Sequence, residues 1–222
     1  MRSLRGAWVQ IPPPAPGPRR LLIPIEARRL GVEREVKLRI KHNEFLTLLE
    51  GRGFKYNIVE TEEQEDLYFD NPSCDLLLED RVFRLRRSSG TVKVAYKGPR
   101  EAMGAEKIRE EIEGALGSEE CSKALQRIGV CTECPENEED LIKLLRENGF
   151  DVKIVVKKER KRIEVRGVPL KITLDNVEGL GEFVEVEGIG SLEFAKSLGL
   201  TCNAVIPSYA HLIHALKHGI HS

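Results

Sequence analysis

Acidic and basic side chains alternate with other residues along a short stretch near the start of the chain. The charged positions are Glu33, Glu35, Lys37 and Arg39, and the apolar positions between and after them are Val36, Leu38 and Ile40. Because successive side chains of a strand point to opposite faces, a strand here collects the charged groups on one face. Carboxylates supply the hard oxygen ligands that Mg²⁺ or Mn²⁺ prefers, and Lys and Arg donate hydrogen bonds to phosphate oxygens. Such a face could hold a metal together with phosphate groups.

The same alternation recurs in later stretches, with apolar residues between the charged ones. Its charged members are Arg84 and Arg86, Lys93 and Lys97, Arg109, Glu111 and Glu113, and Glu185 and Glu187. A half-buried strand with its charged face in water shows the pattern too, but recurrence with mixed signs favours another arrangement. Strands of this kind predict a barrel with a charged interior, whose apolar faces turn outward under helices.

The segments around these rows predict the elements that position them. We expect strands at about 33–40, 54–60, 64–69, 81–88, 91–98, 106–113, 150–166, 169–178 and 181–188, and helices at about 43–52, 118–128, 136–148, 190–198 and 207–217. Asn43 is the expected cap of the first helix. Strands outnumber helices and connect through short turns such as Ser88-Ser89-Gly90, which favours antiparallel pairing.

Length and charge narrow the class of protein. The chain has 222 residues, enough for one substantial core or two small ones, and its formal net charge is -1. This balance gives no overall field to attract a nucleic acid or an anionic lipid, so an anion site must come from local clustering. No run of about 18 apolar residues is present to span a membrane. We therefore expect a cytoplasmic protein without a membrane partner.

Residues 1–31 differ in composition from the rest of the chain. Prolines crowd positions 12–18, and because proline lacks a backbone donor this stretch forms neither a helix nor an interior strand. We expect a disordered tail, or a segment that is not native because translation begins near Leu30 or Val32. Residues 32–222 are expected to form one domain.

Cysteines and histidines give weaker signals. The five cysteines are an odd number without a secretory signal, so no disulfide framework is expected. Cys131 and Cys134 have half the spacing of a zinc ribbon, and a loop pair, reduced or occasionally oxidised, is the preferred interpretation. His214 and His218 are four residues apart, but a solvated helix face is favoured over a metal site.

The first charged row has a specific counterpart, since Glu33-x-Glu35-x-Lys37 resembles the ExExK signature of the CYTH superfamily. These triphosphate tunnel metalloenzymes include class IV adenylyl cyclases, thiamine triphosphatases and inorganic triphosphatases. Further fragments that match in the expected order are Gln64-x-Asp66-x-Tyr68-Phe69-Asp70, Arg84-x-Arg86, Lys97-Gly98-Pro99, Arg109-x-Glu111-x-Glu113, Lys158-x-Arg160, Thr173-Leu174-Asp175, Phe183-x-Glu185-x-Glu187 and Ser208-Tyr209. The likeness covers about residues 32–216. It implies an α+β fold in which a closed eight-stranded antiparallel β-barrel holds a triphosphate in a charged tunnel, with helices packed outside.

The resemblance also implies roles for individual residues. The metal-facing carboxylates, for Mg²⁺ or Mn²⁺, would be Glu33, Glu35, Glu111, Glu113, Asp175, Glu185 and Glu187. The phosphate-binding cations would be Lys37, Arg84, Arg86, Lys97, Lys158 and Arg160. The catalytic set would be Glu33, Glu35, Lys37, Asp66 and Tyr68. Tyr68 is expected either to pack or to hydrogen-bond a base, a ribose or a ligand water, and Tyr209 is expected to anchor the last helix as a cap over the barrel.

Among the reactions of this superfamily, the sequence most resembles the class IV adenylyl cyclase branch, which converts ATP to cyclic AMP and pyrophosphate. A triphosphatase acting on thiamine triphosphate, a nucleoside triphosphate or inorganic triphosphate is the alternative, because the same barrel electrostatics serve both reactions. A third hypothesis is a non-catalytic module that binds polyphosphate or the 5′-triphosphate end of an RNA. The expected partner is a small-molecule triphosphate rather than a nucleic acid, and the oligomeric state, a dimer included, stays open.

Overall fold

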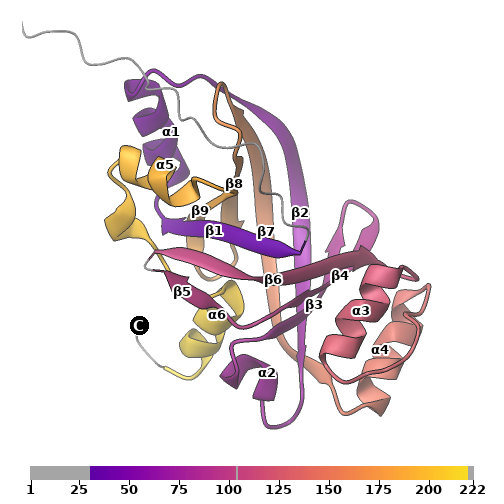
Figure 1. Cartoon of the computed structure of the whole chain (residues 1–222). Coiled ribbons are helices and arrows are strands. Elements are labelled where there is room, and N and C mark those ends of the chain that lie inside the picture. The colour runs from indigo at the N-terminus through magenta and orange to yellow at the C-terminus, as the bar shows by residue number, and fades with distance from the viewer. Residues whose placement is uncertain (1–30, 104, 220–222) are drawn as a thin grey trace, which may run out of the picture.

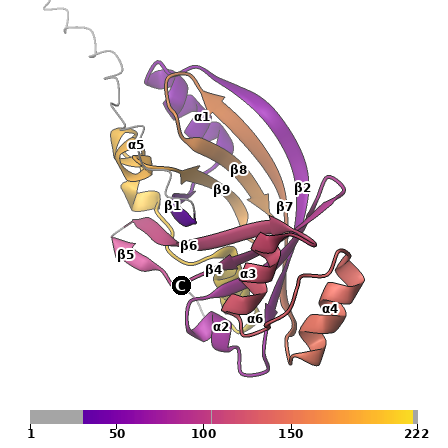
Figure 2. The same cartoon turned by 45° about the vertical axis from the view of Figure 1, so that its right-hand side comes forward.

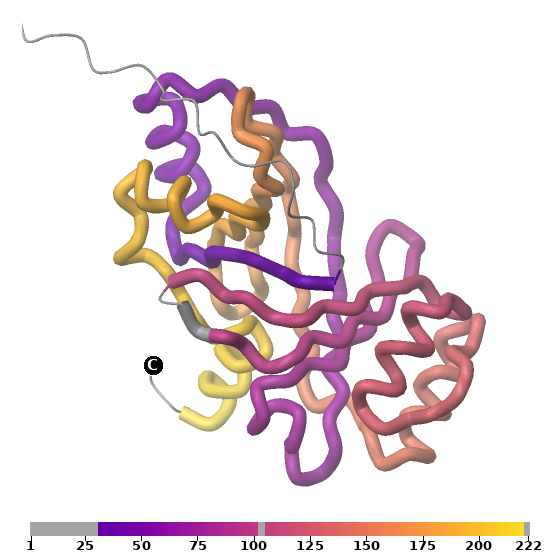
Figure 3. Tube along the Cα trace, in the orientation of Figure 1, coloured from indigo at the N-terminus to yellow at the C-terminus, as the bar shows by residue number. Residues whose placement is uncertain are grey.

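Eight antiparallel strands form a closed barrel in the computed structural model, which describes residues 31–103 and 105–219 (Figure 1). The strands are β1 (Val32–Arg39), β2 (Tyr56–Asp70), β3 (Val82–Ser88), β4 (Thr91–Lys97), β6 (Glu106–Ala115), β7 (Asp151–Val165), β8 (Lys171–Val177) and β9 (Gly181–Glu187). Their order is β1-β9-β8-β7-β2-β3-β4-β6, and β6 pairs back onto β1 to close the ring, as the trace in Figure 3 shows. The short strand β5 (Glu101–Met103) pairs with the first residues of β6. The expected α+β fold with a closed eight-stranded antiparallel barrel is confirmed.

Helices cover the outside of this barrel (Figure 2). They are α1 (His42–Gly51), α2 (Asp75–Leu78), α3 (Glu119–Arg127), α4 (Glu138–Glu147), α5 (Ser191–Ser197) and α6 (Tyr209–Lys217), with a 3-10 turn at Thr201–Asn203. Apolar residues of the strands form one cluster with α1 and α5, a second with α3 and α4, and a third with α6. The hydrophobic core therefore lies between barrel and helices, which leaves the barrel interior to the polar side chains.

Strand β1 shows how the alternation produces this arrangement. Val36 and Leu38 are fully buried and belong to the cluster with α1 and α5. Glu35, which precedes Val36, and Lys37, which lies between Val36 and Leu38, line the cavity inside the barrel instead. Burying charged groups is tolerated only where opposite charges pair with them, so each interior row needs partners on neighbouring strands.

The predicted elements match the structure with a few differences. Strands expected separately at 54–60 and 64–69 form one strand, β2, which runs through a register irregularity between Ile58 and Glu60 opposite β7. The expected cap at Asn43 is wrong, because α1 begins after Lys41 and has no side-chain cap. The turn α2 and the strand β5 were not predicted, since four and three residues are too few to show a period.

A disulfide joins Cys121 of α3 to Cys134 in the segment before α4. Cys74, Cys131 and Cys202 are free. This single disulfide was not predicted, and because Cys134 is joined to Cys121 the preferred interpretation of Cys131 and Cys134 as a loop pair is wrong. Sequence spacing could not show this, because the buried face of α3 brings Cys121 to the loop.

Gly31 belongs to the barrel rather than to the preceding segment. Its carbonyl accepts a hydrogen bond of 2.9 Å from the backbone N–H of Glu111, and its φ of +90° lies in the region that favours glycine. The predictions for residues 1–30 lie outside the described residues. No helix within residues 31–103 and 105–219 is long and apolar enough to cross a membrane.

Candidate active site inside the barrel

A charged cavity of about 70 Å³ lies inside the barrel. Eight Lys or Arg residues and six Glu residues line it among the residues that the structure describes. All six predicted phosphate-binding cations are in this lining, and so are six of the seven predicted metal-facing carboxylates. Asp175, the seventh, and Asp66 are fully buried behind it. The structure thus brings the sequence-predicted residues together from all eight strands of the barrel.

Glu33 on β1 forms a tight cluster with residues of β4 and β6. Its carboxylate accepts hydrogen bonds from Lys97 Nζ and from Arg109 Nε, the latter at 2.6 Å. Lys97 Nζ also lies 3.0 Å from Glu111 Oε1. Burial raises the pKa of Glu33, but the positive charges of Lys97 and Arg109 outweigh it and bring this pKa to about 2. Glu33 therefore stays ionised, and Lys97 is shared by two carboxylates.

Facing residues of β1 and β9 form a second charged cluster. Glu35 faces Glu187 across the pair, and Lys37 faces Glu185 with 3.4 Å between Nζ and Oε1. Lys107 on β6 donates a hydrogen bond of 2.9 Å to Glu35 Oε1. Burial, together with the nearby charge of Lys37, lowers the pKa of Lys107 to about 8.

Lys107 was missing from the predicted residues, and Arg109, although it belongs to a predicted charged row and to a matching family fragment, was given no role. Both lie an even number of residues before Glu111 on β6. Their side chains therefore point to the same face of the strand as Glu111, which is the barrel interior. Both are almost completely buried, and they hold Glu35 and Glu33 respectively. The alternation along β6 could have identified Lys107, because it lies two residues before Arg109 and therefore on the same face of the strand.

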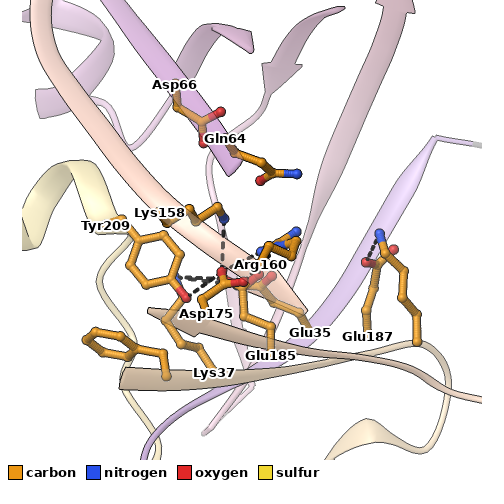
Figure 4. A network of polar contacts seen from close by, with 12 residues as sticks. Glu35, Lys37, Gln64, Asp66, Lys158, Arg160, Asp175, Glu185, Glu187 and Tyr209 are labelled. Atoms are coloured by element: carbon orange, nitrogen blue, oxygen red, sulfur yellow. Dashed lines mark hydrogen bonds and ion pairs between the residues drawn. The ribbon is translucent and has the colours of Figure 1, made fainter. Parts of the chain in front are cut away.

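Asp175 on β8 holds two cations of β7 in place (Figure 4). It accepts hydrogen bonds from Lys158 Nζ at 2.9 Å and from Arg160 Nε at 2.7 Å. Its Oδ2 also accepts the hydroxyl proton of Tyr209 at 3.0 Å. Because both carboxylate oxygens already have partners, Asp175 positions cations in this structure. Its assignment as a metal ligand stays a prediction.

Asp66 on β2, the strand on the other side of β7, holds two arginines of β3 in the same way. Arg86 donates to it through Nε at 2.6 Å and Nη2 at 2.7 Å, and Arg84 Nη1 lies 3.5 Å away. Burial raises the pKa of Asp66, yet Arg84 and Arg86 keep it far below its usual range. The geometry therefore assigns Asp66 to positioning these arginines, while its catalytic role stays a prediction.

Tyr209 closes the cavity from the first turn of α6. Its ring packs edge to face on Phe183 with centroids 5.2 Å apart, and the ammonium groups of Lys37 and Lys158 lie 4.0 and 5.0 Å from the ring centroid. Ser208 caps the helix by accepting from the backbone N–H of His211. The expected anchoring of the last helix by Tyr209 is confirmed, and Tyr68 also lines the cavity.

The carboxylates of the cavity fit a divalent cation in their chemistry. Glu35 and Glu187 lie directly opposite each other on β1 and β9, where like charges repel unless a cation separates them. Within the described part of the chain, no group of three or more Asp, Glu, His or Cys residues is gathered as a metal site. Glu35 and Glu187 instead contact Lys107 and Lys171. A divalent cation held there would replace these lysines as the countercharge.

A closed antiparallel barrel with such a charged tunnel defines a known class of protein. Residues 31–195 match the family model described as CYTH domain, and the chain belongs to this family of triphosphate tunnel enzymes. A "Putative adenylate cyclase" of Methanocaldococcus jannaschii is 29% identical over 157 residues, which are 70% of this chain and 76% of that protein.

Solved structures agree with the fold. A protein from Pyrococcus horikoshii OT3 is similar with a TM-score of 0.60 and 26% identity, over 82% of this chain and 98% of that one. An adenylyl cyclase-named protein from Hippeastrum, for which a dominant triphosphatase activity is stated, is similar with a TM-score of 0.57 and 19% identity. That alignment covers 86% of this chain and 97% of the Hippeastrum chain.

Proposed function

We propose that this protein is a divalent-metal-dependent enzyme of the class IV adenylyl cyclase type, which converts ATP to cyclic AMP and pyrophosphate. In this reaction the ribose 3′-hydroxyl attacks the α-phosphorus, the bond to the β-phosphate breaks, and the hydroxyl proton is lost to a base or to water. The name of the Methanocaldococcus jannaschii relative supports the proposal. So does the balance of charge in the tunnel.

That balance is the observation that carries the proposal. The lining holds eight cations and six carboxylates among the described residues, and Asp66, Asp175 and Lys107 pair with this lining from behind. A triphosphate carries about four negative charges, and one Mg²⁺ reduces this to about two. A metal–triphosphate complex supplies both an anion for the cations and a cation for the carboxylates, whereas a neutral ligand supplies neither.

Arg84 supplies a donor that is ready for an anion. Its Nε is buried and has no hydrogen-bond partner, although its other nitrogens contact Asp66 and Glu113. An unpaired buried donor costs about 1–3 kcal/mol, which a phosphate oxygen would recover. Arg84 is therefore the cation from which we expect the first contact to the phosphate chain.

Several cations must exchange partners before they can bind phosphate. Lys97 is held by Glu33 and Glu111, and Lys37 by Glu185. Mg²⁺ or Mn²⁺ held by Glu35 and Glu187, with Glu33 nearby, would withdraw charge from the phosphate oxygens and so assist departure of the leaving group. Lys37, Lys97 and Arg86 would bind and orient the phosphates, and Asp66 and Asp175 would keep the arginines and Lys158 in place.

Triphosphate hydrolysis is the second candidate, because the tunnel offers little surface to a base. Val82, Tyr68 and Tyr209 are the apolar or aromatic residues of the described lining. A non-catalytic polyphosphate or RNA 5′-triphosphate binding module is less well supported. Six Glu residues in the lining repel an anion and so weaken its binding unless a bound metal cation neutralises their charge.

The purified full chain should be incubated with ATP, thiamine triphosphate or inorganic triphosphate in Mg²⁺ or Mn²⁺, and the products resolved by chromatography. Cyclic AMP with equimolar pyrophosphate supports the cyclase. Orthophosphate release identifies a triphosphatase, and metal-dependent binding without any product identifies a binding module. The Glu35→Gln variant is the control for contaminating enzymes, since we expect its turnover to fall by roughly 10²–10³.

A further inference from the structure

A second cavity, of about 160 Å³, lies between α2 and α6 at one end of the barrel. These two helices lie side by side at the lower end of the molecule in Figures 1 and 2. Tyr68 and Val82 line this cavity and the charged tunnel alike, so the two cavities adjoin at these residues. None of the predicted metal or phosphate ligands lines the second cavity.

The chemistry of the second cavity differs from that of the tunnel. Its surface is mostly apolar and aromatic, with Phe69, Leu76 and Phe83 among the contributing residues, and its buried Asp70 accepts hydrogen bonds from backbone N–H groups of α2. The exposed residues Lys153 and Lys217 place cations at its edge. An apolar cavity with a few polar groups at its edge is typical of a site for an organic ligand.

The second cavity is large enough for a ring. A dry apolar cavity of about 150 Å³ holds a benzene ring, so this cavity, at about 160 Å³, has room for a flat aromatic ring. The tunnel is lined mostly by charged groups. A ring placed in the tunnel would bury charged groups without giving them partners, which is costly.

We propose that the second cavity is the binding site for the aromatic heterocycle of the triphosphate substrate. The inference rests on the proposed function, because it requires the triphosphate group to occupy the tunnel. The sugar or linker of the substrate would then lie against Tyr68 and Val82, where the two cavities adjoin. Substrates with a heterocycle would gain affinity from this site, and inorganic triphosphate would not.

Filling the cavity tests the proposal. Ala210 of α6 is 2% exposed and lines the cavity, so the Ala210→Leu side chain would occupy it. Ala215 lies on the same helix but lines neither cavity, which makes Ala215→Leu the matched control. Calorimetry at saturating Mg²⁺ would compare a non-hydrolysable ATP analogue with inorganic triphosphate on the wild type and both variants.

We expect Ala210→Leu to weaken binding of the ATP analogue by about 10-fold or more, equivalent to at least 1.4 kcal/mol. Binding of inorganic triphosphate should stay unchanged, and Ala215→Leu should change neither. Equal affinity of Ala210→Leu and wild type for the analogue would overturn the inference alone. Failure of the wild type to bind either ligand would overturn the proposed function and the inference with it.

A measurement on the wild type guards against a variant that fails to fold. Cys74 is a free, half-buried thiol that lines the second cavity, whereas the free thiol of Cys202 is exposed and lines neither cavity. Alkylation by N-ethylmaleimide, followed by peptide mass spectrometry, reports both thiols in one sample. The ATP analogue should slow alkylation of Cys74 several-fold and leave Cys202 unchanged, while inorganic triphosphate should protect neither. Unchanged alkylation of Cys74 with bound analogue would contradict the proposed site.

Discussion

At the scale of single residues, the tunnel is a set of exchangeable ion pairs. Arg86 is held by Asp66 through two hydrogen bonds, and Lys97 by Glu33 and Glu111. Each pair offsets part of the cost of burying its members. A bound triphosphate would replace the carboxylates as the partner of these cations. Their positive charge therefore determines triphosphate affinity more than their present hydrogen bonds do.

Removal of one of these cations should weaken triphosphate binding without removing the metal ligands. For Arg86→Ala and Lys97→Ala we expect a loss of about 1.5–3 kcal/mol in affinity, or roughly 10- to 150-fold, because each charge-assisted hydrogen bond is lost in a desolvated site. Calorimetry with a non-hydrolysable ATP analogue at fixed Mg²⁺ measures it. Arg87→Ala is the matched control, since the neighbouring Arg87 is exposed and contacts Glu65 and Glu138. Unchanged affinity in both tunnel variants would contradict phosphate binding by this wall.

Glu33 gives the protein a specific dependence on acid. Its pKa is about 2 in the folded protein against an ordinary value of 4.5, because Lys97 and Arg109 outweigh the effect of burial. A lowered folded pKa means that the unfolded chain binds the proton more readily. The stabilisation by Glu33 is therefore complete above pH 4.5 and is lost as the pH falls from about 4.5 to 2.

We expect this group to contribute about 3 kcal/mol to the fall in unfolding free energy over that range. Urea unfolding at a series of pH values should show a shallower pH dependence for Glu33→Gln than for the wild type, although the variant is less stable at neutral pH. Glu63→Gln, at an exposed position of β2, should keep the wild-type slope. Parallel slopes for wild type and Glu33→Gln would show that Glu33 is not paired as described.

At the scale of elements, the alternation of charged and apolar residues was enough to predict most strands and the charged interior. It could not predict which strand supplies the partner of each charge. Asp175, Arg160 and Tyr209 meet from β8, β7 and α6, and no local pattern encodes that meeting. Lys107 was missed for another reason, because the family fragments cover Arg109 but do not extend back to it. Such pairings depend on barrel closure, which is a property of the whole sheet.

The disulfide between α3 and the segment before α4 should stabilise the part of the molecule formed by these two helices. Cys121 and Cys134 are 13 residues apart in sequence, and closing a loop of roughly 15 residues is worth about 3 kcal/mol in the chain-entropy account. The Cys121→Ser and Cys134→Ser double variant should lose about 2–3 kcal/mol in urea unfolding without reductant. Dithiothreitol should reduce the stability of the wild type similarly and leave the variant unchanged. A Cys131→Ser and Cys202→Ser variant, with the disulfide intact, should match the wild type.

At the scale of the whole molecule, the described residues form one barrel in which the first strand pairs with two later ones. The start of the domain, expected at residue 32, moves to residue 31, because the carbonyl of Gly31 accepts a hydrogen bond from the backbone N–H of Glu111. We expect deletion of residues 1–30 to leave folding and turnover intact, as this segment offers no apolar periodicity for a core. Thermal unfolding and the product assay above test it. A fall in Tm of more than about 5 °C would show that the segment contributes to stability.

The position of β1 between β6 and β9 also determines when the barrel can be completed. Residues 32–39 pair with residues 107–110 and 183–187, so the sheet stays open until the last strand has joined. Long-range pairing of this kind makes folding slow and leaves strand edges exposed to other chains. In an open sheet the face that later becomes the tunnel meets water, and its rows of Lys, Arg and Glu are well solvated there. The charges that suit the finished tunnel to a triphosphate would thus also protect the unfinished sheet from aggregation.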